Sequence, residues 1–578
     1  MNDAKYLSGL RVRVRPSGGR ALEQPIPGAG TYDVGPVRVG IEQDEDTVRW
    51  SVSARTSAIA LDAVGLVWDA GEAGDDPRMF VQGYQSWSPT RTMRLGIDRD
   101  PSRDPRAPSL VHAAFHADPY VAPEGELRSE QVTLLALHRP LLQCIGFVAG
   151  DRHAGTLRAR IVAGQVEVCA EAWLGGARLA VDATRSLHDI VVDEGDDPAV
   201  LLEAWAGRVA RAGEARAGAE YLTGWCSWYQ YFERVSERVL RDNLARADAW
   251  PFELFQLDDG YQRAIGDWLA TNERFPSGLD GVADAIDASG HTPGIWLAPF
   301  LAAPGSEIAR IHPEWLAAAP GADGFAIGMY NDAWGGFMAV LDTTQPEVLD
   351  HLATTAAALV AAGYHYLKLD FTFSAAMPGR YADPTLTPAE RVRAGFAAIR
   401  RGAGDEAFLL ACGAPLGAVV GVVDGMRIGA DVAPWWDPAP DQGERLPGYE
   451  ATTPSTHNAF VNTCTRSFMH RRLWVNDPDC VMLRTVDTHL APPAAEAWAR
   501  TVGCSGGLLV VSDDLGLVDV GARRLLDDVI AHGRAADADA RTGRSPRCLG
   551  LLDPEGPAGI ASAGTSVIVD PASGEAVP

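Results

Sequence analysis

Residues 364–371 read YHYLKLDF, a short apolar run whose last residues include a lysine and an aspartate. Eight runs of this kind, separated by helical patterns, occur over roughly 290 residues, and each ends in polar or charged side chains. They lie at residues 224–229, 252–259, 292–299, 364–371, 408–412, 425–429, 473–479 and 507–514. Eight alternating strand and helix units in a stretch of this length predict a central (β/α)8 barrel of the TIM type.

The segments on either side of this stretch have a different pattern. Up to about residue 195, short alternating runs are separated by Gly, Pro and Asp clusters, which is typical of an all-β sandwich. The predicted fold is therefore α/β with flanking all-β domains. Its predicted parts are an N-terminal β-sandwich at 1–197, a linker helix at 198–220, the barrel at 221–520 and a small C-terminal β-sandwich domain at 521–578.

Composition narrows the class of protein. The 76 acidic and 50 basic side chains give a formal charge of −26, which argues against nucleic acid or an anionic membrane as partner. The sequence shows no apolar N-terminal signal and no apolar run long enough to cross a bilayer. Its eight cysteines have no C-x-x-C spacing. We therefore expect a cytoplasmic protein with reduced thiols and no cysteine-type zinc site.

The predicted barrel also indicates where a site would lie, because barrel enzymes place their sites at the carboxyl ends of the strands. Carboxylates dominate those ends in this chain, and aromatic side chains flank them. No histidine ends a predicted strand and no HExxH motif occurs, so we expect neither a metal nor an organic cofactor. Carboxylates accept hydrogen bonds from sugar hydroxyls, and a pyranose ring packs on Trp or Tyr. The pattern therefore favours carbohydrate chemistry, in which two carboxyl groups take opposite roles.

Lys368 and Asp370 are two residues apart on a predicted strand and therefore project to the same face. An ammonium beside Asp370 favours its ionised form, which a nucleophile requires. The alternative is a structural ion pair in the barrel mouth. Only Lys5 and Lys368 are lysines among the 50 basic residues, which indicates that a compact ammonium is needed at residue 368.

Asp431 follows the sixth predicted strand. If it faces Asp370 across the barrel mouth, the neighbouring negative charge raises its pKa toward that of a general acid. The alternative is a loop aspartate that caps a turn before Pro434.

Three further motifs have both a functional and a structural interpretation. Asp258 and Asp259 either bind two adjacent sugar hydroxyls or form a strand-end turn. Cys412 is either a core residue or part of a pocket wall. The motif GYQSWS at 83–88 belongs either to the sandwich core or to a loop that brings a stacking tryptophan over the barrel mouth.

Seven motifs along the barrel, taken together, resemble glycoside hydrolase family 36, the α-galactosidase or melibiase family, and especially its shorter bacterial members. They are GWCSWYQYF (224–232), FQLDDGYQ (255–262), GIWLAPF (294–300), YLKLDF (366–371), CGAPLG (412–417), DGMRIGADVAPWW (424–436) and NDPDC (476–480). GYQSWS extends the resemblance into the N-terminal region. One such motif is weakly diagnostic, whereas seven in the family's order are specific.

The resemblance implies an N-terminal β-supersandwich, a (β/α)8 barrel and a C-terminal β domain. It implies a retaining double displacement with Asp370 as nucleophile and Asp431 as acid/base. Asp258 and Asp259 match the pair that binds the galactose 4- and 6-hydroxyls. The positions that match contacts to the 2- and 3-hydroxyls are Lys368, Cys412 and Arg427. The positions that match aromatic walls of the site are Trp87, Trp228, Tyr229 and Trp296. Larger family members read K-W-D at the nucleophile and have a different segment around the acid/base, so their assignments do not transfer directly to this chain.

We therefore expect a retaining exo-α-galactosidase that hydrolyses terminal α-D-galactosyl residues of galacto-oligosaccharides such as melibiose or raffinose. Two alternatives within enzymes are an α-N-acetylgalactosaminidase and an α-galactosyl transferase using the same site. A non-catalytic sugar-binding protein is a third alternative, against which the presence of both Asp370 and Asp431 argues. The sequence specifies neither the natural aglycone nor the oligomeric state, and it assigns no role to residues 321–339.

Overall fold

The computed structural model of the chain describes residues 8–44, 46–138, 140–181, 183–321, 323–439 and 446–577. Lys5 lies outside the described residues. Within them, no helix combines the length and the apolar character needed to cross a bilayer.

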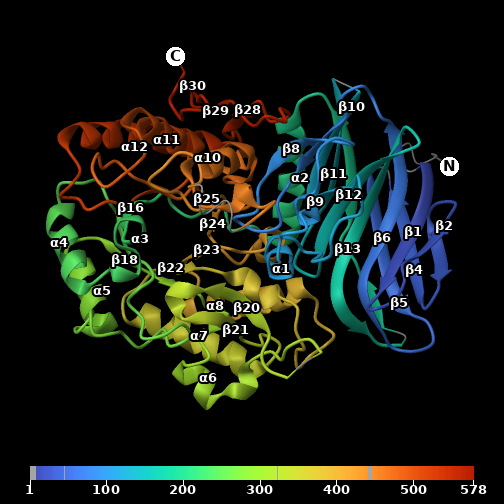
Figure 1. Cartoon of the computed structure of the whole chain (residues 1–578), viewed down its shortest axis with the longest axis horizontal. Coiled ribbons are helices and arrows are strands. Elements are labelled where there is room, and N and C mark those ends of the chain that lie inside the picture. The colour runs from blue at the N-terminus through green and yellow to red at the C-terminus, as the bar shows by residue number, and fades with distance from the viewer. Residues whose placement is uncertain are drawn as a thin grey trace.

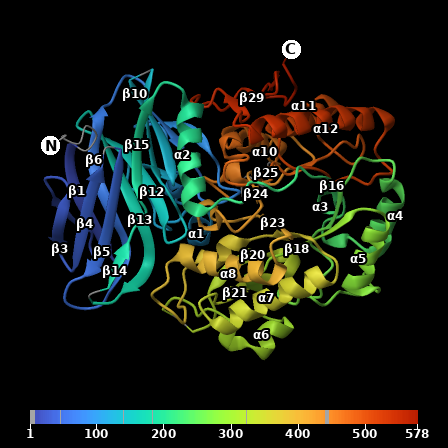
Figure 2. The same cartoon turned by 180° about the vertical axis from the view of Figure 1, so that it is seen from behind.

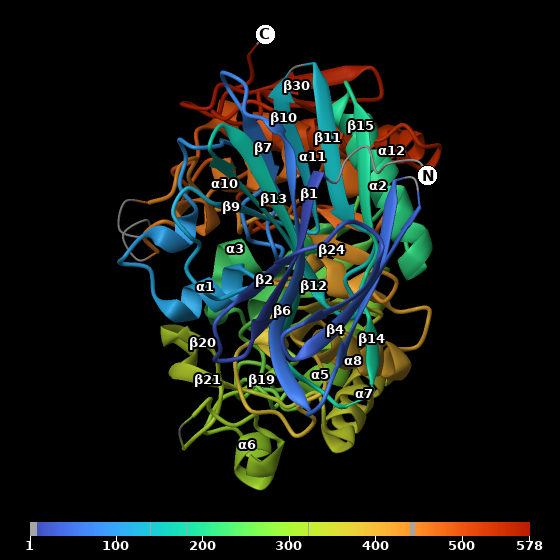
Figure 3. The ribbon, with the colours of Figure 1, turned by 90° about the vertical axis from the view of Figure 1, so that its right-hand side faces the viewer.

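The N-terminal part is a sandwich of two antiparallel sheets, as predicted (Figures 1 and 3). Alternate side chains of its strands face inward; in β5 every second residue is buried, and the inward side chains form one apolar core. The six-stranded sheet contains β1 (Ser8–Pro16), β2 (Leu22–Pro25), β6 (Ile59–Glu72), β9 (Leu127–Glu130), β12 (Ala154–Val162) and β13 (Gln165–Leu179). The nine-stranded sheet contains β3 (Gly30–Val34), β4 (Val37–Asp44), β5 (Thr47–Ala54), β7 (Arg78–Val81), β8 (Arg91–Arg94), β10 (Val132–His138), β11 (Leu141–Phe147), β14 (Thr184–Ser186) and β15 (Ile190–Gly195).

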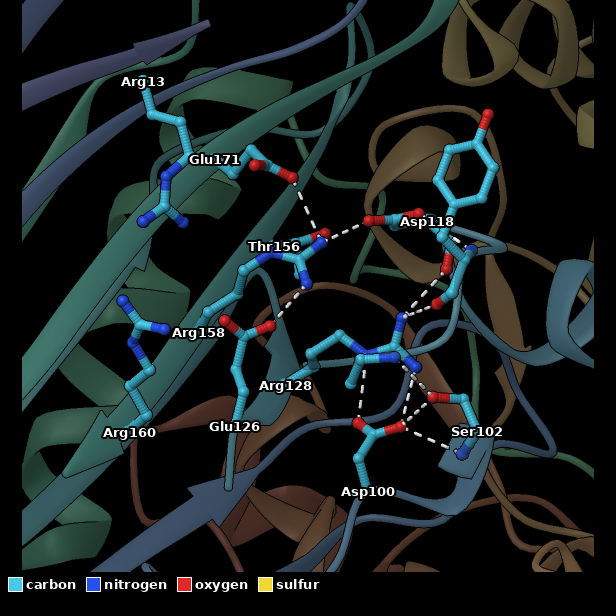
Figure 4. A network of polar contacts seen from close by, with 12 residues as sticks. Arg13, Asp100, Ser102, Asp118, Glu126, Arg128, Thr156, Arg158, Arg160 and Glu171 are labelled. Atoms are coloured by element: carbon cyan, nitrogen blue, oxygen red, sulfur yellow. Dashed lines mark hydrogen bonds and ion pairs between the residues drawn. The ribbon is translucent and has the colours of Figure 1, made fainter. Parts of the chain in front are cut away.

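A network of buried ion pairs fixes one edge of the six-stranded sheet (Figure 4). Arg158 on β12 pairs with Asp118, Glu126 and Glu171, and Arg128 on β9 pairs with Asp100 at 2.7 Å. Through Asp100 and Asp118 these arginines hold both ends of the segment that contains helix α1 (Ser109–Phe115). The network therefore determines where this segment lies against the rest of the molecule.

The predicted linker helix is present as α2 (Pro198–Gly213). Asp197 caps its N-terminus by accepting hydrogen bonds from the backbone of Ala199 and Val200, and Pro198 occupies the first turn. Its buried face, which includes Leu202 and Trp205, joins the core of the barrel. In Figures 1 and 2 this helix stands between the sandwich and the barrel.

The central sheet is entirely parallel and is built from the predicted runs. Every one of the eight runs contains or overlaps an observed strand, which confirms the predicted parallel sheet. Its strands are β16 (Thr223–Cys226), β17 (Leu254–Leu257), β18 (Thr292–Leu297), β22 (Tyr366–Leu369), β23 (Phe408–Ala411), β24 (Gly425–Arg427), β25 (Val475–Asp477), β26 (Cys480–Val481) and β27 (Leu509–Val511). One predicted strand is too long, because residues 228 and 229 belong to helix α3 (Trp228–Tyr231).

The pairing pattern curls this sheet round on itself. β25 pairs with β24, and β26 pairs with β27, which in turn pairs with β16. Since only Pro478 and Asp479 separate β25 from β26, these two strands form one interrupted position of the sheet. The two sheet ends are thus joined through a single stretch of chain, and the carboxyl ends of all the strands point the same way.

Helices follow most of the barrel strands, largely where the periodicity predicts them. The predicted ones are α4 (Glu237–Ala247), α7 (Pro346–Ala361), α8 (Pro388–Ala403), α10 (Thr456–Thr465), α11 (Pro492–Ser505) and α12 (Val520–Arg541). Helix α8 begins with a capping box between Thr387 and Glu390. Helix α5 (Gly278–Ala288) was not predicted, because its two glycines weaken the helical pattern, and a buried apolar face stabilises it instead.

The C-terminal part differs from the prediction. The described residues contain one antiparallel sheet of three strands, β28 (Arg547–Leu549), β29 (Gly559–Ser562) and β30 (Thr565–Ile568), and not a β-sandwich. Its inward side chains Ile560 and Val567 join the same apolar core as helix α11. So short a segment has no second sheet to cover its apolar face, and the barrel helices cover it instead.

Candidate active site

A cavity of about 260 Å³ opens at the carboxyl ends of the barrel strands. Eight of the eleven predicted site residues border it. They are Trp87, Trp228, Asp258, Asp259, Trp296, Lys368, Asp370 and Asp431. The remaining wall is formed by Phe115, Glu233, Asn331, Trp334, Phe371, Leu446, Thr452 and Pro454.

Lys368 on β22 and Asp258, which follows β17, form a buried ion pair although β18 lies between the two strands. The Lys368 ammonium donates to Asp258 Oδ2 at 2.9 Å, and the amide of Gln256 donates to the same oxygen. Burial by itself lowers the pKa of Lys368, but the neighbouring acidic groups, Asp258 foremost, together outweigh it and raise the pKa well above its usual value. The charge of Lys368 lowers the pKa of Asp370, as predicted, while the hydrogen bond of the ammonium goes to Asp258, which follows the next strand but one.

Asp259 accepts hydrogen bonds on both carboxylate oxygens. Gln262 Nε2 donates to Oδ1 at 2.5 Å, and the indole Nε1 of Trp334 donates to Oδ2 at 2.9 Å. Burial, together with the nearby charges of Asp258 and Glu233, raises the pKa of Asp259 to about 6, and the two hydrogen bonds oppose that rise. Asp259 thus borders the cavity with its orientation fixed from two sides.

Asp370 directly follows β22. Its Oδ2 accepts from the indole Nε1 of Trp296 at 2.9 Å, and its Oδ1 accepts from the backbone N–H of Phe371 at 2.8 Å. The pKa of Asp370 is raised by burial, and the charge of Lys368 and the Trp296 hydrogen bond limit that rise. Lys368 therefore stabilises the ionised carboxylate through its field, without a direct hydrogen bond between the two side chains.

Asp431 lies just beyond β24 and is about one-third exposed. Arg427 Nη2 donates to its Oδ1 at 2.8 Å. Burial raises the pKa of Asp431, the Arg427 charge opposes this, and the charge of Asp479 adds to the rise. The prediction gave Asp370 as the neighbouring charge; Asp479 is a larger contributor in the structure.

Asp479 lies behind Asp431 and binds the same arginine, Arg427. It pairs with Arg427, accepts from the hydroxyl of Tyr229, and accepts from the backbone N–H of Val432 at 2.9 Å. Its backbone has a φ of 87°, in the left-handed region, at the break between β25 and β26. Strained backbone of this kind persists where surrounding contacts impose it. Asp479 is therefore the counter-charge of the Arg427–Asp431 pair.

Aromatic rings enclose the cavity from several elements. Trp87 reaches it from the loop after β7 and packs edge-on against Phe371, with ring centroids 4.9 Å apart. This approach requires glycine at 413, because a Cβ there would lie 2.9 Å from the Trp87 ring and 3.1 Å from the Phe371 backbone. Of the two interpretations of GYQSWS, the loop over the barrel mouth is therefore the one that the structure supports.

Three predicted site residues do not border the cavity. Tyr229, Cys412 and Arg427 are all buried; Tyr229 and Arg427 belong to the Asp479 cluster behind Asp431, and Cys412 has no exposed surface. Tyr229 is therefore not an aromatic wall, which corrects the prediction. These residues adjoin Asp370 or Asp431 from behind.

The segment 321–339 supplies the residue that sequence reasoning missed. It contains β20 (Ile327–Asn331), the 3-10 turn η4 (Asp332–Trp334) and most of β21 (Gly336–Val340). Trp334 from this turn borders the cavity and bonds Asp259. The stretch has no helical or eight-unit periodicity, and only its Gly-rich, Trp-containing turn signalled a loop near a site.

The described residues contain no group of three or more His, Cys, Asp or Glu side chains placed to hold a metal ion. The arrangement instead offers two separately held carboxyl groups, Asp370 and Asp431, in a cavity lined by indole rings and by the Asp258–Asp259 pair.

Comparison with known proteins agrees with this geometry. Residues 221–387, which contain Asp258, Asp259, Trp296 and Asp370, match the family model described as Melibiase. This part of the chain is therefore similar to the melibiase family. The chain is also similar to the α-galactosidase AgaA of Geobacillus stearothermophilus, with 32% identity over 149 residues, 24% of this chain and 19% of that protein. It is likewise 32% identical to an Escherichia coli α-galactosidase over 129 residues, 21% of this chain and 17% of that protein. These alignments thus span less than a fifth of each curated relative.

One solved structure matches this chain over nearly its whole length. The α-galactosidase TtGalA from Thermus thermophilus, in complex with p-nitrophenyl α-D-galactopyranoside, has a TM-score of 0.71 and 25% sequence identity. The match covers 92% of this chain and 96% of that one. The fold of this chain is therefore similar to that of TtGalA over most of its length.

Proposed function

We propose that this chain is a retaining, exo-acting α-galactosidase. The observation that carries the proposal is the pair of carboxyl groups, Asp370 and Asp431, that border one cavity beside Asp258 and Asp259. The Melibiase match and the relatives that carry the name α-galactosidase support the same activity.

The first step is displacement at the anomeric carbon. An oxygen of Asp370 forms a bond to that carbon as the glycosidic C–O bond breaks, and protonated Asp431 gives its proton to the departing oxygen. In the second step Asp431 removes a proton from water, the water oxygen bonds to the anomeric carbon, and the bond to Asp370 breaks. Two inversions leave the product in the α configuration, as retention requires.

The environments of the two carboxyl groups suit these opposite roles. Asp370 receives two fixed N–H donors and the field of Lys368, all of which favour its ionised form. The environment of Asp431 favours the opposite state. Burial and the charge of Asp479 favour its protonated form, while Arg427 holds it in place and limits the rise of its pKa. Partial exposure leaves Asp431 accessible to the water of the second step.

The substrate we propose is the terminal α-galactosyl residue of a small galactoside such as melibiose or raffinose. Asp258 and Asp259 would accept hydrogen bonds from two hydroxyls of the galactose, and Lys368 would donate one. Cys412 is fully buried and does not border the cavity. This favours galactose over N-acetylgalactosamine, since no space beside Cys412 receives an acetamido group.

We also propose that the chain acts in the cytosol. All eight cysteines lie in the described part of the chain and are free thiols, which supports a reducing environment.

Proton NMR of an aryl α-galactoside digest tests the proposal directly. We expect α-galactose to appear first and then to mutarotate, whereas early β-galactose would exclude the retaining mechanism. Asp370→Ala is expected to abolish turnover while the folded protein keeps its thermal transition. Unchanged turnover by this variant would refute the assignment of the nucleophile, and absence of turnover by the unmodified chain would refute the activity.

A further inference from the structure

The hairpin of β20, η4 and β21 is built to hold a tryptophan over the barrel mouth. The side chain of Asn331 caps the turn by accepting from the backbone N–H of Ala333 at 2.9 Å. Gly335, with a φ of 87°, ends the turn directly after Trp334. The base of the hairpin is anchored, since residues 338–340 are buried and β21 pairs with β19 (Leu301–Ala302) just after β18.

Trp334 contacts three features of the site. Its Nε1 donates to Asp259 Oδ2 at 2.9 Å. Its ring lies 5.9 Å from that of Trp296, which bonds Asp370, and 5.0 Å edge-on from that of Phe371. The Trp334 indole thus lies between Asp259, the carboxylate proposed to bind the sugar, and two residues next to Asp370. These are Trp296, which donates a hydrogen bond to Asp370, and Phe371, which follows it in the chain.

Asp259 needs such a donor because its other neighbours are mostly unfavourable to a carboxylate. Burial and the negative charges of Asp258 and Glu233 all disfavour its ionised form. Of the nearby cations, Lys368 is hydrogen-bonded to Asp258, and Arg274 donates to the carbonyl oxygen of Gly260. Gln262 and Trp334 are the donors that the structure gives to the Asp259 side chain within the described residues, apart from water.

We propose that Trp334 is a positioning residue that holds the Asp259 carboxylate ionised and oriented to accept sugar hydroxyls. The inference rests on the proposed α-galactosidase function and extends it to an element outside the strand-end motifs. It also gives the hairpin a role. Trp334 at its turn brings an N–H donor to Asp259, and the charges near Asp259 from Asp258 and Glu233 are both negative. Trp334 therefore acts through Asp259 on substrate binding and not on the bonds that break.

Trp334→Phe is the sharpest variant because it keeps an aromatic wall and removes only the N–H. We expect KM for an aryl α-galactoside to rise about fivefold or more with kcat largely unchanged, as hydrogen bonds to charged groups are among the stronger ones. We also expect the acidic limb of kcat/KM to move to higher pH, because the lost hydrogen bond favours ionisation of Asp259. Trp334→Ala should show the same shift in pH with a larger rise in KM.

Tyr330→Phe is the matched control on the same hairpin. It removes the exposed hydrogen bond from Tyr330 Oη to Asp332 Oδ1 and leaves the cavity wall intact. We expect its KM and pH profile to match those of the unmodified enzyme. A Trp334→Phe enzyme with the KM and acidic limb of Tyr330→Phe would overturn the positioning role alone. Absence of turnover by the unmodified chain would overturn the proposed function and this inference together.

Discussion

The charge of Lys368 acts on two carboxyl groups of the site, Asp258 and Asp370. Its hydrogen bond goes to Asp258, while its field lowers the pKa of Asp370. A single ammonium thus neutralises one buried carboxylate and keeps a second one ionised. An ammonium is a compact point charge and not a planar fork, so it suits a role toward two carboxylates at once, in a chain otherwise rich in arginine.

Replacing Lys368 by methionine should therefore damage both stability and catalysis. Removal of one partner from a buried ion pair leaves the other unpaired, and we expect the free energy of unfolding to fall by about 3–5 kcal/mol. The pKa of Asp370 should rise, so kcat at neutral pH should fall as well. Urea unfolding and a pH profile measure the two effects.

The double variant Asp258→Asn with Lys368→Met separates these effects. With neither charge left in the pair, much of the lost stability should return, whereas activity should not. If Lys368→Met alone is as stable as the unmodified chain, the ion pair does not contribute as argued here.

Glu233 offers a second test of the charges around Asp259. Its backbone lies 2.9 Å from where a side chain at Gly260 would begin, so this carboxylate is held close to the turn after Asp259. The charge of Glu233 raises the pKa of Asp259, and Glu233→Gln should lower it from about 6. The acidic limb of kcat/KM should then move to lower pH, opposite to Trp334→Phe.

The same residue has a consequence for stability. The pKa of Asp259 is raised from its ordinary 3.8 to about 6, so the folded chain binds this proton more tightly than the unfolded chain does. Its contribution to stability is present at low pH and is lost as the pH rises from about 4 through about 6. Glu233→Gln should reduce that loss, which chemical denaturation at pH 4 and at pH 7 would measure. An unchanged difference between the two pH values would contradict the coupling.

For single residues, the sequence predicted which side chains lie at the barrel mouth better than it predicted which of them form hydrogen bonds or ion pairs with one another. Strand ends of a parallel barrel converge, so Asp258, Asp370 and Asp431 could be assigned to one mouth from their order alone. Which carboxylate pairs with Lys368 depends on the direction that its side chain takes in the barrel mouth, and packing in three dimensions determines that direction. Trp334 was missed because a hairpin insertion has no periodic pattern that fixes where its tip lies.

At the scale of elements, a buried arginine attaches the GYQSWS loop to the barrel. Arg466, directly after α10, donates to the carbonyl oxygens of Ser86, Ser88 and Ile428. Burial lowers its pKa to about 9. The loop that carries Trp87 to the cavity is therefore held by a side chain of the barrel and not by the sandwich alone.

Arg466→Met should loosen this loop. Several carbonyl oxygens would lose their donor, and at about 1–3 kcal/mol for each buried group left unpaired we expect a loss of stability of at least about 3 kcal/mol. Because Trp87 would no longer be held at the cavity, KM for an aryl α-galactoside should rise as well. Thermal unfolding and steady-state kinetics measure both.

Arg500→Met is the control for loss of an arginine. Arg500 forms a helix-surface pair with Glu496 on α11, and such pairs contribute little. We expect near-normal stability and KM from this variant. A stability loss in Arg466→Met without any change in KM would show that the position of Trp87 does not depend on this arginine.

The elements themselves were predictable to an uneven degree. Alternating strands and amphipathic helices such as α8 have a clear periodicity, and their type followed from it. Helix α5 and the C-terminal sheet did not, because glycine-rich or very short segments take their structure from the surface they pack on. The split between β25 and β26 at Pro478 and Asp479 has the same origin, since it depends on the Asp479 contacts with Arg427 and Tyr229.

At the scale of the whole molecule, one apolar core runs through parts that the sequence divides into separate domains. It includes Phe80 and Leu134 of the sandwich, Trp205 of α2, the barrel strands, and Ile560 of the C-terminal sheet. The sandwich has a second core of its own around Trp50. Since the shared core crosses the predicted boundaries, the parts should unfold together although multidomain proteins often do not.

We therefore expect a single transition in differential scanning calorimetry of the unmodified chain. Trp205→Ala should break this coupling, because Trp205 on α2 packs against Phe468, and its Nε1 donates to the carbonyl oxygen of Phe147 in the nine-stranded sheet at 2.9 Å. The cavity should cost about 3–5 kcal/mol, concentrated at the interface, so that the sandwich unfolds in a separate, earlier transition.

Trp50→Ala distinguishes coupling from simple destabilisation. Trp50 is also buried and its Nε1 also donates to a carbonyl oxygen, that of His188 at 2.7 Å, but it belongs only to the core of the sandwich. Its loss weakens the sandwich and leaves the shared core intact, so the whole chain should still unfold in one transition at a lower temperature. If Trp205→Ala also gives one lowered transition, or if the unmodified chain already gives two, the shared core does not couple the domains, and the position of Trp87 over the barrel mouth must then depend on local contacts such as those of Arg466.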